Sequence, residues 1–144
     1  MSADAPLIVV SNKPNEADRT AILAALIAHN EAAFGPANWE PFGLLVKDPA
    51  SGETIGGLLG RITYDWLFVE FLALPERYRG IDLGTKLLTQ AEDIARDKGC
   101  IGVWLDTFDF QAPAFYAKLG YEVFGAIADH PQGHQRFFVQ KRLI

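Results

Sequence analysis

The sequence predicts a mixed α/β (α+β) fold in which helices cover both faces of a central sheet of about seven strands. Short apolar, β-rich runs recur along the chain, and three stretches of helical periodicity interrupt them. Turn-forming residues join several runs as hairpins, which implies antiparallel pairs, whereas helical crossovers imply parallel ones. We therefore expect a mixed, largely antiparallel sheet. Because 144 residues suffice for one core and no repeat or long linker interrupts them, we expect a single domain over residues 1–144.

The N-terminal quarter is predicted to form a strand and then a helix. Residues 7–10 are apolar and β-rich, and Asn12-Lys13-Pro14 follows them as a break. From about residue 15 to 33, apolar side chains recur at helical spacing, and Gly35-Pro36 ends the pattern. The periodic positions are Ile22, Leu23, Leu26 and Ile27.

The next three apolar runs are predicted strands. Residues 42–47 and 54–63 flank Asp48-Pro49-Ala50-Ser51-Gly52, whose turn formers indicate a hairpin. Residues 66–74 follow a turn at Asp65 and give the longest strand signal. The first half of this run is almost continuously apolar, which is typical of a central strand buried on both faces.

Residues 83–98 predict an amphipathic helix that Lys98-Gly99 ends. Glu92 and Arg96 are four residues apart, so we expect them to pair on its solvent side. The apolar face consists of Leu83, Leu87, Leu88, Ala91, Ile94 and Ala95.

The remaining elements alternate strand and helix before a final hairpin. Residues 100–105 predict a strand, and residues 112–119 predict a short helix. Residues 121–127 and 135–141 predict two strands joined by the loop at residues 129–133.

Composition excludes several classes of partner. The net charge is −5 and Lys and Arg form no cluster, which argues against nucleic acid. The chain has no apolar run of membrane-spanning length, so we expect no membrane partner. The opening segment, residues 1–6, lacks the features of a secretory signal, and the single Cys100 suits a reducing compartment. We expect a cytoplasmic location.

The segment Arg79-Gly80-Ile81-Asp82-Leu83-Gly84 carries the clearest functional signal. It lies between the predicted strand at residues 66–74 and the predicted helix at residues 83–98. A glycine-bearing turn at a helix start presents free backbone N–H groups and the positive end of the helix dipole, which favours a phosphate. Arg79 would bind the pyrophosphate of a cofactor, or would pair with Glu76 or Asp82 as an ordinary surface arginine.

Two motifs at the expected separation resemble the GNAT superfamily of acetyl-CoA-dependent N-acetyltransferases. Arg79 and Gly84 match the first and last fixed positions of its Q/R-x-x-G-x-G/A turn, with Asp82 in place of the middle glycine. About thirty residues later, Phe115-Tyr116-Ala117-Lys118-Leu119-Gly120-Tyr121 resembles the second landmark of the family. Ala112 matches a further position, whereas Asp109 replaces the usual asparagine. The resemblance covers nearly the whole chain.

The resemblance implies that acetyl-CoA binds with its pyrophosphate on the turn and its pantetheine arm along the end of the preceding strand, as an added strand would. Asp82 is compatible with this, since backbone N–H groups bind the phosphate; a glycine is required only where φ is positive or no side chain fits. The implied cofactor-binding residues are Leu72, Ala73, Leu74, Arg79, Gly80, Ile81, Asp82, Leu83, Gly84, Thr85 and Asp109.

The resemblance and the residues together suggest two catalytic groups. Tyr116 resembles the family tyrosine that donates a proton to the departing CoA thiolate; the alternative is a packed aromatic. Glu70 is the one ionisable residue in the run at residues 66–74, and alternation places it on the face of Leu72 and Leu74. We expect it to be the general base that deprotonates the acceptor ammonium, or else a structural carboxylate with a partner.

Other polar residues have weaker assignments. Asp106 and Asp109 could orient the amine or cap the helix at residues 112–119, and for Asp109 we expect the cap. His130 and His134 lie in a loop with Pro131 between them, so we expect no metal site. The expected reaction is direct acetyl transfer to a small amine, with a longer acyl donor and a homodimer left open. The alternative is a non-catalytic acyl-CoA sensor.

Overall fold

The computed structural model describes residues 4–144. Residues 1–3 lie outside the described residues. They form half of the opening segment, residues 1–6, for which the sequence predicts no secretory signal. The chain divides into two compact units, Met1–Ala37 and Asn38–Ile144, which are described separately. The single domain over the whole chain stays a prediction. Within the described range, no helix is both long enough and apolar enough to cross a membrane.

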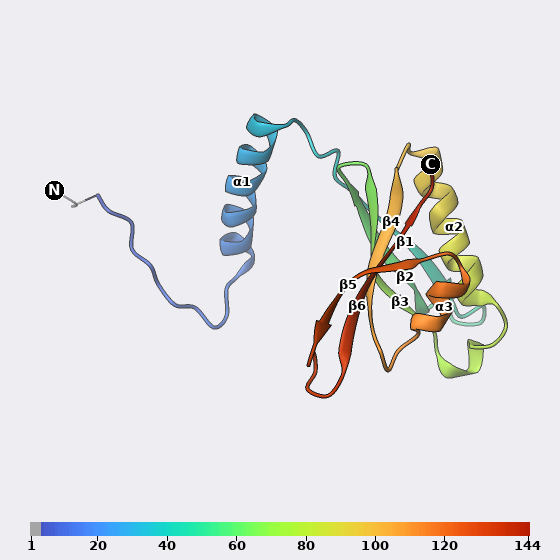
Figure 1. Ribbon diagram of the computed structural model, residues 1–144. Coiled ribbons are helices and arrows are strands. Elements are labelled where there is room, and N and C mark those ends of the chain that lie inside the picture. Colours follow the sequence, from blue (N-terminus) through green and yellow to red (C-terminus); the bar gives the residue numbers. More distant parts are fainter. Residues whose placement is uncertain (1–3) are drawn as a thin grey trace. The chain divides into compact units, whose positions relative to one another are not determined.

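The first unit contains the helix α1 (Glu16–Ala33; Figure 1). Its start is fixed by a reciprocal capping box: the Asn15 side chain accepts from the Asp18 N–H at 2.8 Å, and the Asp18 carboxylate accepts from the Asn15 N–H at 3.0 Å. The predicted helix is therefore confirmed. The predicted strand at residues 7–10 is wrong, because these residues have no regular secondary structure. A β-rich sequence forms a strand only where a neighbour pairs with its backbone.

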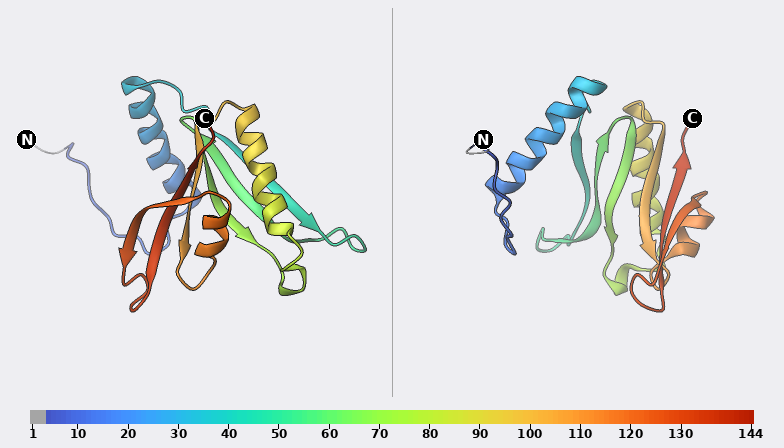
Figure 2. Two further views of the ribbon diagram at one scale, coloured as in Figure 1. Left: turned by 45° about the vertical axis from the view of Figure 1, so that its right-hand side comes forward. Right: turned by 60° about the vertical axis from the view of Figure 1, so that its left-hand side comes forward.

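The second unit is built on one mixed sheet (Figures 1 and 2). In the described chain it has six strands, in the order β1-β2-β3-β4-β6-β5, rather than the seven that included residues 7–10. The pair β3·β4 is parallel and every other neighbouring pair is antiparallel, so the predicted mixed, largely antiparallel sheet is confirmed. The strands are β1 (Glu40–Lys47), β2 (Thr54–Thr63), β3 (Trp66–Ala73), β4 (Gly102–Phe108), β5 (Glu122–Ala128) and β6 (Gln135–Arg142).

Two helices of this unit cover one face of the sheet (Figures 1 and 2). They are α2 (Leu83–Asp97) and α3 (Pro113–Lys118), and a short 3-10 turn, η1 (Glu76–Tyr78), precedes α2. Alternate side chains of the strands meet the apolar stripe of α2 in a single core. Its most deeply buried members include Leu58, Leu67, Leu88, Val103, Leu105 and Val139.

One predicted contact of α2 is wrong. Glu92 does not pair with Arg96 in solvent; it is 5% exposed and accepts hydrogen bonds from the Tyr121 hydroxyl at 2.8 Å and from Lys141 Nζ at 3.0 Å. Arg96 instead contacts Asp93 at 3.1 Å. A buried carboxylate needs such partners. They lie 29 and 49 residues further along the chain, so local spacing could not identify them.

The parallel pair β3·β4 is short, and this opens the sheet. Trp66–Phe68 of β3 pairs with Gly102–Trp104 of β4, and the two strands then diverge. The start is close-packed: a Cβ on Gly102 would lie 2.5 Å from the Trp66 ring, so only glycine fits there. Beyond Phe68 the edge of β3 that faces β4 has no strand partner in the described residues. We call this opening the wedge.

Candidate active site

A cleft of about 380 Å³ lies where the end of β3 meets the start of α2 and the helix α3. It brings together both sequence motifs, although about thirty residues separate them. Most of the predicted cofactor-binding residues line it, and Ile81 and Asp109 are not among its lining residues. The lining consists of Leu72, Ala73, Leu74, Tyr78, Arg79, Gly80, Asp82, Leu83, Gly84, Thr85, Ala112, Phe115 and Tyr116.

The turn before α2 lines this cleft and leaves backbone N–H groups without helical partners. Gly80 and Asp82 both have positive φ, 81° and 61°. The first hydrogen bond of the helix runs from Lys86 N–H to the Asp82 carbonyl at 3.0 Å. The N–H groups of residues 83–85 therefore precede the helical ladder and are available to an anion at the positive end of the dipole.

Asp82 occupies a backbone conformation that favours glycine. It is the N-cap residue of α2, in the left-handed region, and its side chain makes no capping hydrogen bond within the described chain. The middle position of the turn therefore does require a positive φ. Asp is one of the few other residues that tolerate it. Its carboxylate adds a negative charge beside the N–H groups that start α2.

Arg79 lies at the rim of the cleft. Its Nε donates to the Leu74 carbonyl at 3.2 Å, which ties the guanidinium to the end of β3. The ion pairs with Glu76 or Asp82 that a surface role would predict are not among the ion pairs of the described residues. The two terminal nitrogens of the guanidinium therefore remain suited to phosphate oxygens.

Tyr116 is the ionisable side chain that α3 places in the wall of the cleft. The residue is 7% exposed, and the Phe115 and Tyr121 rings lie edge-on to its ring at 5.1 and 6.0 Å. Burial, with a further contribution from the negative charge of Asp106, raises the pKa of Tyr116 to about 12. The hydroxyl therefore stays protonated near neutral pH and can donate a hydrogen bond.

Glu70 lies on the opposite face of the sheet from Leu72, contrary to the alternation argument. A β-bulge causes this: Gly60 pairs with Val69 and Leu59 with Phe71, so Glu70 has no partner in the register. Leu72 packs on the core, whereas the Glu70 carboxylate is half-exposed and lies 3.9 Å from the Arg61 guanidinium. The extra residue of a bulge shifts the face of each side chain after it.

Asp106 lies on the β4 side of the wedge. It alternates with the buried Leu105 and Thr107, so its side chain points to the face away from α2. Arg136 of β6 donates a hydrogen bond from Nε to its Oδ1 at 3.0 Å, and a terminal nitrogen of Arg136 forms an ion pair with the same oxygen at 2.8 Å. The sequence identified Asp106 as a candidate but gave no sign of Arg136, which lies 30 residues away.

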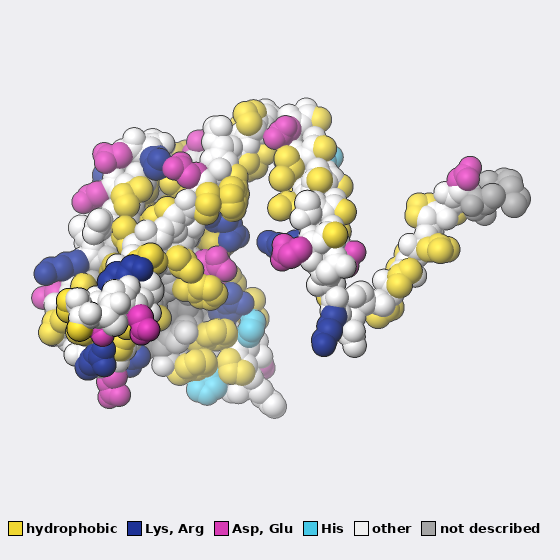
Figure 3. Space-filling view, turned by 180° about the vertical axis from the view of Figure 1, so that it is seen from behind, with side chains coloured by type: hydrophobic (Ala, Val, Ile, Leu, Met, Phe, Trp, Pro, Cys, Tyr) yellow, Lys and Arg dark blue, Asp and Glu magenta, His cyan; other side chains and the backbone are white. Residues whose placement is uncertain are grey.

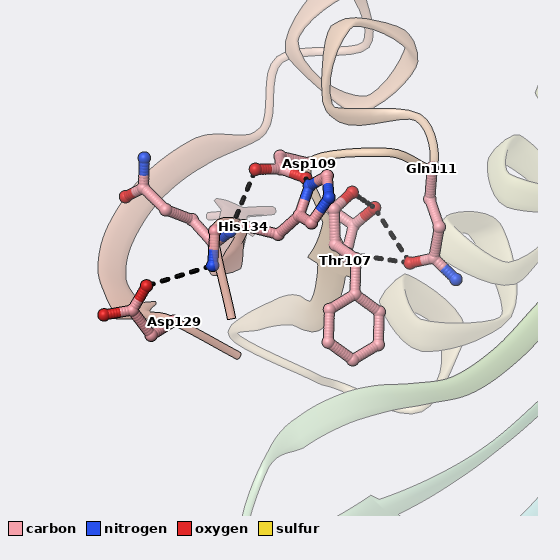
Figure 4. A network of polar contacts seen from close by, with 8 residues as sticks. Thr107, Asp109, Gln111, Asp129 and His134 are labelled. Carbon is pink, nitrogen blue, oxygen red and sulfur yellow. Dashed lines mark hydrogen bonds and ion pairs between the residues drawn. The ribbon is translucent and has the colours of Figure 1, made fainter. Parts of the chain in front are cut away.

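Asp109 holds the β5–β6 loop rather than the start of α3 (Figure 4). Its Oδ1 contacts His134 Nδ1 at 2.8 Å, and its Oδ2 accepts from the Gln135 N–H at 2.9 Å. Desolvation is the largest single influence and opposes the shift, but the hydrogen bonds and the charge of His134 together lower the pKa of the Asp109 carboxyl. The predicted cap is wrong, since Ala112 is the N-cap residue of α3 and has no capping side chain.

Gln111 stabilises the bend between β4 and α3 (Figure 4). Its Oε1 accepts from the Phe108 N–H at 2.7 Å and lies 3.4 Å from the Thr107 hydroxyl. The His130 ring belongs to the same end of the sheet and lies 3.4 Å from a terminal nitrogen of Arg136. Over residues 4–144, no group of three or more His, Cys, Asp or Glu side chains is arranged to hold a metal ion.

Comparisons with known proteins agree on one family. The family model described as "Acetyltransferase (GNAT) family" matches residues 15–121. Blasticidin-S acetyltransferase of Streptomyces morookaense is 42% identical over 93 residues, 64% of this chain and 68% of that protein. An acetyltransferase of Agrobacterium fabrum is 31% identical over 134 residues, 93% of this chain and 97% of that one. The crystal structure of an acetyltransferase from Bacillus cereus has a TM-score of 0.80 at 34% identity, covering 94% of this chain and 98% of that chain.

Proposed function

Because the chain belongs to the GNAT family of acetyltransferases, we propose that it transfers the acetyl group of acetyl-CoA directly to a primary amine of a small molecule. Family membership makes the chain an acyltransferase, and acetyl-CoA is the donor that this family uses. The observation that carries the proposal is the cleft that joins the Arg79–Thr85 turn to Tyr116 beside the open edge of β3. Direct transfer implies a ternary complex and no acetyl-enzyme.

The donor would occupy the cleft from the turn to the wedge. The N–H groups of residues 83–85 and the Arg79 guanidinium would hold the pyrophosphate. The pantetheine arm would follow residues 72–74, whose backbone edge is open toward β4. This places the thioester at the end of the cleft that Tyr116 lines, with a β3 N–H near Leu72 to polarise its carbonyl.

The acceptor would enter the wedge from the face away from α2. An ammonium must lose one proton before its nitrogen can attack the thioester carbon, and Glu70, on the β3 side, is the proposed proton acceptor, directly or through water. A C–N bond then forms, the C–S bond breaks, and the CoA thiolate leaves. The second proton of the nitrogen passes to solvent.

Tyr116 would assist the departing sulfur by hydrogen bonding. A CoA thiol has an ordinary pKa near 8.5, whereas the pKa of Tyr116 is raised to about 12. Complete proton transfer from the tyrosine to the free thiolate is therefore uphill by roughly 5 kcal/mol. The group can still donate a hydrogen bond as charge develops on sulfur. We expect Tyr116 to accelerate the reaction without being indispensable.

Blasticidin S is the acceptor that we propose to test first, because the Streptomyces morookaense relative that shares 42% identity is named for it. The test mixes the protein with acetyl-CoA and blasticidin S, and follows both CoA thiol release and the product by mass spectrometry. The proposal predicts one acetyl group transferred per thiol released. A panel of other small primary amines extends the test.

Two results would contradict the proposal. One is thiol release that no amine increases above hydrolysis of acetyl-CoA alone. The other is a covalent acetyl-enzyme that is trapped on the protein and passes its acetyl group to the amine at the rate of turnover.

A further inference from the structure

The two sides of the wedge each carry one carboxylate with an arginine. The last parallel pair of the sheet joins Phe68 to Trp104, and Glu70 and Asp106 each follow two residues later. Both point to the face away from α2. Glu70 has Arg61 at 3.9 Å, and Asp106 has Arg136 at 2.8 Å. The face on which the acceptor would enter therefore carries two acidic groups, one on each strand, at the same distance along the strands from the last parallel pair.

The two carboxylates differ in how firmly they are held. The Glu70 side chain is 47% exposed and lies 3.9 Å from the Arg61 guanidinium, so few contacts hold it. The Asp106 side chain is 20% exposed, and both of its contacts with Arg136 fall on the same oxygen, Oδ1. Neither contact reaches Oδ2. Asp106 is thus fixed in place with one acceptor oxygen to spare.

A purely structural pair would more commonly use both oxygens. The planar guanidinium matches a carboxylate with two parallel hydrogen bonds, one to each oxygen. Asp109 shows the saturated case in this protein, since His134 takes Oδ1 and the Gln135 N–H takes Oδ2. Asp106 departs from that pattern.

Aromatic residues lie beside both acidic groups in the sheet, since Asp106 pairs with Phe138 across β4 and β6, and Phe68 lies two residues before Glu70. The Phe68 and Trp104 rings are 4.2 Å apart, and Arg61 lies 4.7 Å above Phe68. Arg136 lies 5.5 Å from the centre of the Phe108 ring and 5.3 Å from that of Phe138. In Figure 3, basic and histidine side chains alternate with hydrophobic ones on this unit. Flat apolar side chains therefore neighbour the pair formed by Asp106 and Arg136.

We propose that Asp106 binds the ammonium group of the acceptor through Oδ2, and that Arg136 is the residue that positions it. The acceptor class that this site fits is a primary ammonium carried next to a flat, apolar or aromatic group. Glu70 then remains the proposed proton acceptor. The inference rests on the proposed function, because it assigns the acceptor side of the same reaction.

The electrostatics of Tyr116 agree with this placement. The negative charge of Asp106 is one of the two causes that raise the pKa of Tyr116, so the carboxylate lies close enough to the proposed reaction centre to act on it. An ammonium bound at Asp106 would offset that charge when the acceptor arrives. Acceptor binding would then make Tyr116 a better hydrogen-bond donor at the moment of transfer.

The test measures probe binding to the protein saturated with CoA, by calorimetry or ligand-observed NMR. The probes are phenethylamine, which carries an ammonium beside a ring, and 2-phenylethanol, in which a hydroxyl replaces it. We expect phenethylamine to bind and 2-phenylethanol to bind much more weakly. Asp106→Asn keeps the Oδ1 contact with Arg136 but removes the charge, and it should weaken phenethylamine binding at least about tenfold.

Three further variants separate binding from structure. Arg136→Lys keeps the charge, and its loss of phenethylamine affinity should be smaller than that of Asp106→Asn. Asp93→Asn removes a solvent-side carboxylate of α2 and should change nothing. The double variant Asp106→Asn with Arg136→Met removes both charges. If Asp106 only neutralised Arg136, this variant would regain probe binding, whereas the proposal predicts that it does not.

The outcomes separate the proposed acetyltransferase function from the assignment of Asp106 as the ammonium-binding residue. Failure of the unmodified protein to bind CoA would contradict the proposed function. CoA binding together with no phenethylamine binding, or with equal phenethylamine affinity in Asp106→Asn, would overturn the assignment of Asp106 and leave the acetyltransferase proposal in place.

Discussion

The carboxylate of Glu92 accepts a hydrogen bond from the Tyr121 hydroxyl at 2.8 Å, and this buried contact ties α2 to the segment behind Tyr116. Lys141 of β6 completes the network at 3.0 Å. The Tyr121 ring lies edge-on to the Tyr116 ring at 6.0 Å. The helix that follows the proposed phosphate-binding turn and the proposed hydrogen-bond donor to sulfur are thus supported by one set of contacts.

Removing the Glu92 carboxylate should destabilise the protein strongly. Glu92→Ala leaves the Tyr121 hydroxyl and the Lys141 ammonium without their shared partner, and we expect a loss of about 3 kcal/mol in the free energy of unfolding. The adjacent Asp93→Ala removes an exposed pair with Arg96 and should cost less than about 0.5 kcal/mol. Urea denaturation measures both. Equal effects of the two substitutions would contradict a structural role for the network.

Replacing Asp82 should tighten the binding of CoA. Asp82→Gly removes a negative charge beside the anion site and suits the positive φ of 61°. We expect the dissociation constant to fall several-fold by calorimetry. Asp82→Asn also tolerates this backbone conformation and removes only the charge, so it should give a similar gain. Weaker binding in Asp82→Asn would show that the carboxylate helps to hold the cofactor.

Removing the Tyr116 hydroxyl should lower kcat with little change in the KM for acetyl-CoA. Tyr116→Phe keeps the ring contacts with Phe115 and Tyr121 and deletes the hydrogen bond to the developing thiolate. We expect kcat to fall by about 10²-fold, at the low end for such groups, because full proton transfer is uphill. Steady-state kinetics measure this, with the thermal unfolding midpoint as control. Unchanged kcat would exclude Tyr116 from the reaction.

Tyr116 should also leave a signature in the alkaline stability of the protein. Its pKa is raised from 10 to about 12 in the folded state, so its contribution to stability is complete below pH 10 and is lost as the pH rises from 10 to about 12. Tyr116→Phe should lose less stability over that range. Burial likewise raises the pKa of Tyr121, which stays in both proteins. Parallel stability curves would show that Tyr116 does not titrate abnormally.

Local patterns predicted most of the fold because they depend on neighbouring residues. The strand β2 was predicted with its observed bounds, and α2 is confirmed to within one residue at its end. The strand expected at residues 7–10 failed because strand formation depends on a pairing partner. The predicted solvent-side pair of Glu92 with Arg96 failed for a related reason. Glu92 is buried against Tyr121 and Lys141, and local spacing cannot show that these residues are adjacent to it.

In the candidate site, too, residues within contiguous motifs were predicted, whereas features that depend on the folded sheet were not. The Arg79 turn and Tyr116 were identified because each lies in a contiguous motif, and the structure brings both to one cleft. The predicted face of Glu70 was wrong because a bulge inserts one residue into β3. Simple alternation along the sequence does not account for an inserted residue. Arg136 was missed because its partner Asp106 lies on a strand that is adjacent only in the folded sheet.

Calorimetric titration with acetyl-CoA determines whether the donor binds in the cleft, and each step of the proposed reaction requires this binding. We predict micromolar binding, weakened about tenfold to a hundredfold in Arg79→Ala, which loses charge-assisted hydrogen bonds to phosphate. Arg96→Ala, on the solvent side of α2, should bind like the unmodified protein. If acetyl-CoA does not bind, or if Arg79→Ala binds it as tightly, then the Arg79–Thr85 turn is not the cofactor site.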